Sequence, residues 1–223
     1  MKAERPRQRL YLFTPILDDT ESFAPALDAA LSAADIAAVL LRLAEADERT
    51  LINRAKAAAG AVQRRDVAAL IDGHAGIVAR AGADGAHLHG IDAFAAALAL
   101  LKPDRIAGAG GLRSRDDAML AGEANADYVM FGEPPPPYPP PRAGEGNGGG
   151  RGLSFEELQE RLEWWADLVE IPCVGYAAGL DEIEPLARTG ADFIALGDWI
   201  WTHPQGAAAA IAAAQSLAEA VCR

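Results

Sequence analysis

Cysteine, basic side chains and long apolar runs are all scarce in this sequence. Only Cys173 and Cys222 occur, without the spacing of a zinc site or a disulfide framework, so we expect two reduced thiols. The 32 Asp and Glu residues outnumber the 20 Lys and Arg residues, and the net charge of -12 argues against nucleic acid or an anionic membrane as partner. No stretch has the length and apolar character of a membrane span, and MKAERPRQRLYLFTP lacks the apolar core of a signal peptide. We therefore expect a cytoplasmic location.

What the sequence does contain is a repeated alternation of short apolar runs and longer Ala- and Leu-rich segments. Each pair is typical of a buried strand followed by a helix, and the chain has eight such pairs. The runs are 9–16, 36–43, 67–73, 85–90, 105–111, 127–134, 171–179 and 191–201. The helical candidates begin near Glu21, Asp47, His74, Ile91, Ser114, Ser154, Asp181 and Pro204. Eight units over 1–223 predict a single α/β domain, a closed (β/α)8 TIM barrel; an open doubly wound sheet would give no reason for the eighth strand.

Local signals support several of these boundaries. Ser154 and Glu157 have the spacing of a helix capping box, and Pro204 suits a first helical turn. Gly82 and Gly190 suit helix C-termini. Tryptophan is expected in packing positions: two residues on the helix after Ser154 and two near the end of the eighth strand, namely Trp164, Trp165, Trp199 and Trp201.

One segment departs from the alternation. Residues 134–152 are rich in proline and then in glycine, which predicts an enlarged loop after the sixth strand, with Arg142 and Arg151 available to an anion. A PPPPYPPP run is also a type of ligand for SH3 and WW modules. The simpler interpretation is a loop over the barrel mouth.

Polar side chains follow the third and fourth strands at the point where each strand ends. Asp72 and His74 end one run, and His89 and Asp92 follow the next. In parallel barrels this end is where ligands bind. The four residues have the ligand types of a mixed nitrogen and oxygen metal site, although polar side chains are also ordinary at strand ends.

Strand periodicity places further polar groups inside the barrel. His87 and His89 alternate with Leu88 and should share a face, with His87 deeper and suited to a core role and His89 at the mouth. Arg42 should face the same mouth, where a buried arginine needs a carboxylate partner. Asp72 is a candidate partner in a structural pair; alternatively both side chains hold a ligand.

Two motifs resemble those of a known family. GAHLHGID (85–92) and ADYVMFGEP (126–134), together with the opening LYLFTP and the order of weaker matches, are similar to the thiamine phosphate synthase and TenI family. The resemblance implies a TIM barrel that couples a hydroxymethylpyrimidine pyrophosphate to a thiazole phosphate and releases pyrophosphate. It also implies Mg²⁺ and basic side chains around the leaving group, because the departing charge must be neutralised.

Several family positions match and several differ. Arg42 matches the family arginine, and Asp92 matches one of two Mg²⁺ carboxylates, but Gly73 stands where the family has the other. Asp72 replaces an asparagine and His89 replaces a glycine. Gly110 replaces a serine. At the end of the seventh strand, where the family binds the thiazole phosphate, Ala177 and Ala178 replace paired glycines. Asp198 lies near the backbone of the eighth strand that would hold the same phosphate. A carboxylate about 4 Å from a phosphate costs roughly 1 kcal/mol in water and about 4 kcal/mol at an effective dielectric near 20.

The resemblance thus implies a set of site residues. Arg42, Asp72 and His89 are the expected catalytic residues, and Asp92 is the expected ligand of Mg²⁺. The expected substrate-binding residues are Arg42, Asp72, His89, Gly110, Ala178, Gly179, Gly197 and Asp198.

Two functions of different class follow from the sequence. One is a divergent transferase of the thiamine phosphate synthase type with weakened or lost parent activity. The other is a non-catalytic protein of the same fold that binds a small heterocycle. The family resemblance and the Trp-bearing helix also suggest a homodimer.

Overall fold

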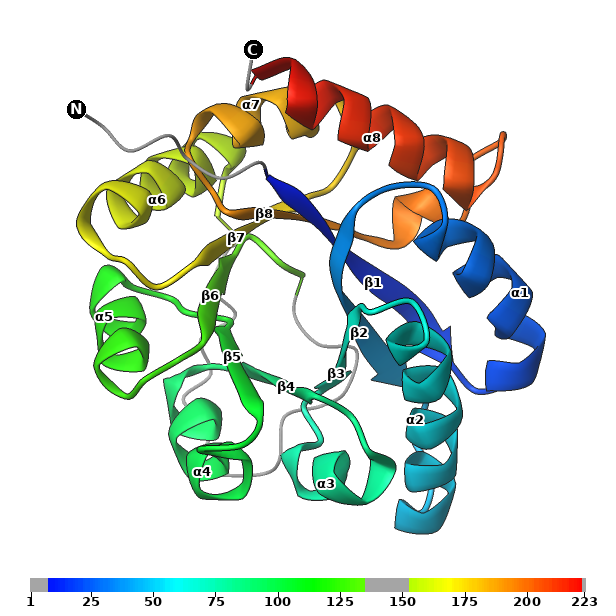
Figure 1. Ribbon diagram of the computed structural model, residues 1–223. Helices are drawn as coiled ribbons and strands as arrows, with labels where there is room; N and C mark the ends of the chain where they lie inside the picture. Colours follow the sequence, from blue (N-terminus) through cyan, green and yellow to red (C-terminus); the bar gives the residue numbers. More distant parts are fainter. Residues whose placement is uncertain (1–7, 135–152, 222–223) are drawn as a thin grey trace.

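The computed structural model describes residues 8–134 and 153–221, and eight parallel strands form a closed barrel within them. Helices surround the ring of strands, as Figure 1 shows. The strands are β1 (Arg9–Leu17), β2 (Ile36–Leu43), β3 (Ala68–Asp72), β4 (Gly85–His89), β5 (Ile106–Gly110), β6 (Tyr128–Phe131), β7 (Cys173–Ala177) and β8 (Phe193–Leu196). The pairing of β1 with β8, from Arg9 opposite Phe193 to Leu12 opposite Leu196, closes the sheet. The predicted (β/α)8 barrel is confirmed.

Each strand is followed by helical structure. The α-helices are α1 (Thr20–Leu31), α2 (Glu48–Gln63), α3 (Val78–Ala81), α4 (Ile91–Leu101), α5 (Arg115–Glu123), α6 (Phe155–Leu168), α7 (Ile183–Arg188) and α8 (Ala207–Val221). Short 3-10 helices precede α3, α7 and α8; they are η1 (Ala75–Ile77), η2 (Leu180–Glu182) and η3 (Asp198–Ile200). No helix of the described ranges has the length and apolar character to cross a membrane.

Alternation along the strands divides the core in two. On β1, Leu10 and Leu12 face the helices, whereas Tyr11 and Phe13 face the barrel axis. Every other residue of a strand lies on the same face, so the inner cluster contains one or two residues from most strands. Its buried members are Tyr11, Phe13, Ala38, Leu40, Leu70, Tyr128, Met130, Val174 and Ala195. The same alternation carries Arg42, two residues beyond Leu40, to the inner face at the mouth.

Some predicted boundaries are confirmed and others are wrong. Ser154 caps α6 with the reciprocal Glu157 hydrogen bond, and Gly82 has the left-handed conformation at the end of α3. The eighth strand was predicted to reach residue 201, but β8 ends at Leu196 because η3 begins at Asp198. Trp199 and Trp201 therefore do not continue the strand. Pro204 is not in the first turn of α8, which starts only after Gly206 with its φ of 85°.

The tryptophans pack as expected, although Trp199 and Trp201 belong to η3 and its end and not to the eighth strand. Trp165 is fully buried in α6 and donates a hydrogen bond to the Ile171 carbonyl at 2.7 Å. Trp201 donates to the Phe13 carbonyl at 2.7 Å and thereby joins the segment after η3 to β1.

Several expectations fall on residues whose structure is not described. Residues 135–152 of the predicted loop, including Arg142 and Arg151, lie outside the described residues, and so does Cys222. Cys173 lies buried in β7.

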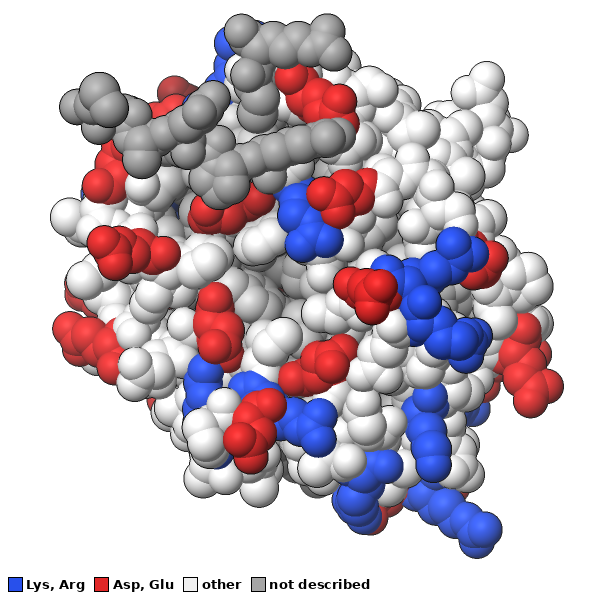
Figure 2. All heavy atoms as spheres, viewed as in Figure 1, with Lys and Arg blue, Asp and Glu red and all other residues white. Residues whose placement is uncertain are grey.

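On the face drawn in Figure 2, basic side chains are interspersed with acidic ones, so that face lacks the uniform basic field that nucleic-acid binding requires.

Candidate functional site

Arg42 at the end of β2 is held rigidly at the barrel mouth. Its backbone N–H donates to the Thr14 hydroxyl at 3.0 Å, and its Nε donates to the Thr14 carbonyl at 2.6 Å. The guanidinium pairs with the Asp198 carboxylate; the Arg42 side chain is 8% exposed and the Asp198 side chain 64%. The sequence had suggested Asp72 as the partner of Arg42, and this is wrong, because Asp198, two residues after β8, takes that position.

Asp198 owes its position to the turn that ends β8. It is the first residue of η3 and follows Gly197, where an added Cβ would come within 1.8 Å of the Tyr176 hydroxyl. Burial raises the pKa of Tyr176, and the Asp198 carboxylate raises it further. Gly197 therefore permits the close packing that brings an aromatic ring, a carboxylate and a guanidinium together.

Asp72 and His89 form a second pair at the mouth. The His89 Nε2 lies 2.6 Å from the Asp72 Oδ1, and the Asp72 side chain is only 1% exposed. Burial acts to lower the pKa of His89, but the hydrogen bond and charge of Asp72, with the charge of Glu133, outweigh it and raise the pKa above 6.5. Chemically, the pair can hold and transfer one proton.

His87 lies below His89, with the two rings 4.9 Å apart, so the predicted common face is confirmed. Its ring is completely buried, and Nδ1 lies 3.0 Å from the Tyr128 hydroxyl, which in turn lies 2.9 Å from that of Tyr11. The Nε2 of His87, however, has no hydrogen-bond partner in the part of the chain that the structure describes. The expectation of a core histidine thus accounts for one ring nitrogen and leaves the other unexplained.

Glu133 is the site residue that the sequence interpretation missed. It follows β6 at the mouth, its side chain is 3% exposed, and its Oε1 lies 3.8 Å from the His87 Nε2, beyond hydrogen-bond distance. The Gly111 N–H donates to the same carboxylate. Gly110 makes room for it, because an added Cβ would lie 2.1 Å from Oε1. The available signal was the carboxylate of Glu133 directly after Gly132, within the sixth predicted run of residues 127–134.

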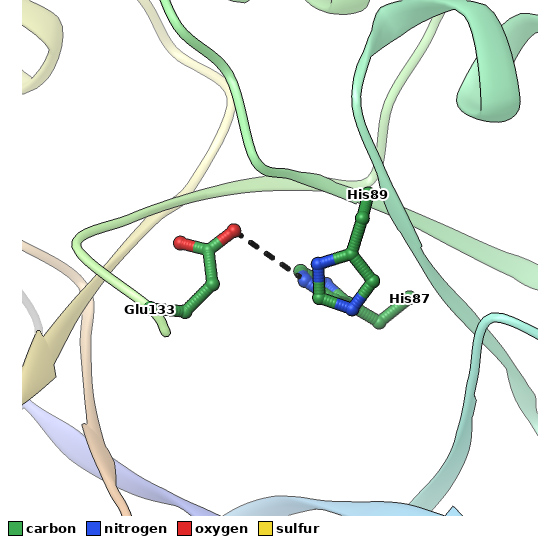
Figure 3. Close-up of side chains that lie close together, drawn as sticks. All are labelled: His87, His89 and Glu133. Carbon is green, nitrogen blue, oxygen red and sulfur yellow. Dashed lines mark ion pairs between the residues drawn. The ribbon is translucent and has the colours of Figure 1, made fainter. Parts of the chain in front are cut away.

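The residues that gather as metal ligands differ from those predicted. Asp72, His74, His89 and Asp92 do not form a ligand cluster; within the described residues the cluster is His87, His89 and Glu133 (Figure 3), with ligand atoms within 4.8 Å of one another. Asp92 is exposed in the first turn of α4 and has no ion-pair partner in the described part of the chain. A single carboxylate of this kind fits Mg²⁺, which proteins commonly hold through one or two carboxylates and substrate phosphates.

The predicted phosphate end of the mouth contains a carboxylate of its own. The Ala178 N–H donates to the Glu182 Oε2 at 2.6 Å. Gly179 follows Ala178 in extended conformation and precedes η2. A backbone amide that would suit a phosphate oxygen is therefore already hydrogen-bonded to an acidic side chain.

A cavity of about 230 Å³ lies at the opposite end of the barrel from these residues. Its lining is mostly apolar and comes largely from early positions of the strands: Arg9, Tyr11, Ala37, Ala38, Ala68, Leu70, Ile106, Asp127, Tyr128, Pro172, Val174 and Phe193. Active sites of such barrels lie at the carboxyl ends of the strands, so this cavity is not the candidate site.

The sequence is similar to proteins of one biosynthetic family. Residues 10–140 match a family model described as thiamine monophosphate synthase, TMP-TENI. The thiamine-phosphate synthase of Rhodospirillum centenum is 38% identical over 206 residues, covering 92% of this chain and 94% of the relative. That of Hyphomonas neptunium is 38% identical over 224 residues, covering 97% of this chain and 96% of the relative.

Solved structures share the fold at lower sequence identity. A thiamine phosphate pyrophosphorylase from Pyrococcus furiosus superposes with a TM-score of 0.72 at 20% identity, covering 96% of this chain and 97% of that chain. A 3-hexulose-6-phosphate synthase superposes with a TM-score of 0.64 at 17% identity, covering 93% and 99%. At these identities the likeness concerns the barrel alone.

Proposed function

Because this chain belongs to the thiamine monophosphate synthase family, we propose that it performs the family type of coupling at its barrel mouth. A hydroxymethylpyrimidine pyrophosphate would lose pyrophosphate as its C–O bond breaks, and the nitrogen of a thiazole phosphate would form the new C–N bond. We further propose that the chain is a divergent member whose activity on these phosphorylated substrates is weakened.

The ion pair of Arg42 with Asp198 is the observation that carries this proposal. Arg42 matches the arginine of the family and is buried at the mouth, but its charge is already balanced by a carboxylate. A diphosphate that binds Arg42 must compete with Asp198. The Asp198 side chain is 64% exposed, so its repulsion of a bound diphosphate is screened by water. The cost is therefore near the roughly 1 kcal/mol expected in water, and not the ~4 kcal/mol expected at an effective dielectric near 20. It corresponds to about a fivefold loss of affinity.

Each of the other site residues has a role in this proposal. Asp92 would hold Mg²⁺, which neutralises the charge of the departing pyrophosphate when it is bound. The pair of His89 with Asp72 would hold a proton near the reacting centre, since the two groups share a hydrogen bond of 2.6 Å. The remaining substrate-binding residues would be Gly110, Ala178, Gly179, Gly197 and Asp198.

A non-catalytic role in binding an uncharged heterocycle is the second candidate. The Ala178 amide that would hold a phosphate is hydrogen-bonded to Glu182, which favours ligands without phosphate. Thermal shift separates the two candidates: greater stabilisation by the unphosphorylated pyrimidine and thiazole than by their phosphates supports binding alone.

Pyrophosphate release from the two family substrates in Mg²⁺ tests the proposed enzyme. We expect turnover that Arg42→Ala and Asp92→Ala each abolish. Arg65→Ala and Asp28→Ala are the matched controls, since these two side chains form an exposed ion pair with a 2.6 Å contact between α1 and the turn that follows α2. No release at high protein concentration would rule out the coupling reaction, and equal release by the Arg42 and Asp92 variants would rule out the roles given to these two residues.

A cytoplasmic location is also proposed, because the two cysteines are expected to be reduced thiols.

A further inference from the structure

Two buried imidazole nitrogens in the barrel point into the same small space, and neither has a hydrogen-bond partner within residues 8–134 and 153–221. They are the Nε2 of His87 and the Nδ1 of His89. A buried polar atom without a partner is costly and needs an explanation. The carboxylate of Glu133 faces the same space, as Figure 3 shows, and all three ligand atoms lie within 4.8 Å of one another.

The other nitrogen of each ring is fixed by a hydrogen bond. The Nδ1 of His87 lies 3.0 Å from the Tyr128 hydroxyl, and the Nε2 of His89 lies 2.6 Å from the Asp72 carboxylate. When each of these nitrogens donates its proton outward, the lone pair of the other nitrogen is directed at the shared space. Histidines that bind metals are oriented in this way by a carboxylate or another oxygen.

Glu133 is held where it can complete the set. The Gly111 N–H donates to its carboxylate, and Gly110 has no Cβ to obstruct it. The carboxylate side chain is 3% exposed, and among the described residues His87 is the one basic side chain that pairs with it. A buried carboxylate needs a compensating charge, which a cation between the three groups would supply.

We propose that the His87 Nε2, the His89 Nδ1 and the Glu133 carboxylate bind one zinc-like divalent transition metal, with a fourth position open toward the barrel mouth. Two histidines and one glutamate are a ligand set of catalytic zinc sites. Donors arranged tetrahedrally at 2.0–2.2 Å from zinc lie about 3.3 Å apart, so the 3.8 Å between His87 and Glu133 must shorten only slightly. The imidazole donors separate this site from Mg²⁺ held by Asp92, because Mg²⁺ prefers oxygen ligands.

Metal titration of the untagged full chain tests the site without measuring activity. After treatment with a chelator and dialysis, we expect the protein to bind one equivalent of Zn²⁺, measured by competition with a chromophoric chelator, in the presence of excess Mg²⁺. Co²⁺ should give the visible spectrum of a four-coordinate site. Zn²⁺ should also raise the melting temperature of the metal-free protein.

Variants distinguish these ligands from other histidines. His89→Asn and Glu133→Gln should abolish the stoichiometric binding, and Asp72→Asn should weaken it by about 10- to 100-fold, since Asp72 acts through His89. His203→Asn is the control, because His203 lies outside the cluster. Circular dichroism and melting of each metal-free variant establish that it folds.

The proposal fails if the wild-type chain binds no stoichiometric Zn²⁺. It also fails if folded His89→Asn and Glu133→Gln bind Zn²⁺ as tightly as the wild type, because the metal would then lie elsewhere. Since metal binding, the Co²⁺ spectrum and the melting temperature are all measured without the coupling substrates, loss of the proposed transferase activity would not affect the result.

Discussion

Three hydrogen-bond donors at the barrel mouth are occupied by carboxylates of the chain itself. The pairs are Arg42 with Asp198, the Ala178 N–H with Glu182, and the Gly111 N–H with Glu133. A guanidinium and backbone N–H groups are also the donors that bind phosphate oxygens in proteins. An incoming phosphate must therefore replace a carboxylate at each of these donors.

Glu182→Gln tests this competition at a single residue. The change removes the negative charge next to the Ala178 N–H, so inorganic phosphate should bind the variant a few-fold more tightly, in line with about 1 kcal/mol for one exposed charge. Isothermal titration with phosphate measures the difference. Glu184→Gln is the control, because Glu184 pairs with Arg188 on the exposed side of α7. Unchanged phosphate affinity in Glu182→Gln would show that this amide does not bind anions.

Gly110→Ala tests the packing beneath the mouth. The added Cβ would lie 2.1 Å from the Glu133 Oε1 and 2.4 Å from the His87 Nε2, so both side chains must move. We expect a loss of about 1–3 kcal/mol in the free energy of unfolding, measured by urea denaturation. Gly76→Ala is the matched control, since no atom of the described residues lies within 4 Å of its added Cβ. Equal stability of the two variants would mean that Glu133 is not packed as described.

At the scale of elements, the accuracy of each predicted boundary depended on what ends the element. The predicted second strand, residues 36–43, coincides with β2 (Ile36–Leu43), because Asp35 precedes an apolar run that only Arg42 interrupts. The eighth strand was predicted too long, because the apolar residues Trp199 and Ile200 continue after Gly197 although the chain has turned into η3. Apolar character alone does not separate a strand end from a buried 3-10 turn.

The N-cap of α2 gives a prediction for acid stability. The Thr50 hydroxyl and N–H hydrogen-bond to Asp47 and lower its pKa from 3.8, so the ionised cap stabilises the fold above that pH. This stability is lost as the pH falls through the lowered pKa in the folded protein. Asp47→Asn keeps the capping oxygen without titrating, so its urea midpoint should fall less than that of the wild type between pH 5 and pH 2. Thr50→Val should also reduce the dependence; identical profiles for all three proteins would contradict this account.

For the whole molecule, the sequence predicted which residues reach the mouth better than it predicted their partners. Barrel topology and strand alternation place Arg42, Asp72 and His89 at the carboxyl ends of their strands, as the structure has them. Partners depend on rotamers and on the path of each loop. Asp198 reaches Arg42 because β8 and β2 both neighbour β1 in the closed sheet, and no spacing in the sequence encodes that contact.

The homodimer expected from the sequence is a further prediction for the whole molecule. Leu168 on α6 is 64% exposed, one turn from the partly buried Trp164, and a dimer would shield it. Light scattering should give twice the mass of the chain, and Leu168→Glu should shift the equilibrium toward the monomer. Leu100→Glu on α4, where Leu100 is 61% exposed, is the control. A wild-type monomer at micromolar concentration would contradict the prediction.

The ratio of kcat/KM for pyrophosphate release between Asp198→Asn and the wild type measures the central claim most directly. The substitution leaves a neutral side chain of the same shape beside Arg42 and removes the competing charge. If the charge of Asp198 weakens the coupling, kcat/KM of the variant should be about fivefold higher than that of the wild type, as expected for roughly 1 kcal/mol. A fall in kcat/KM, or an unchanged kcat/KM, would show that Asp198 does not limit the reaction.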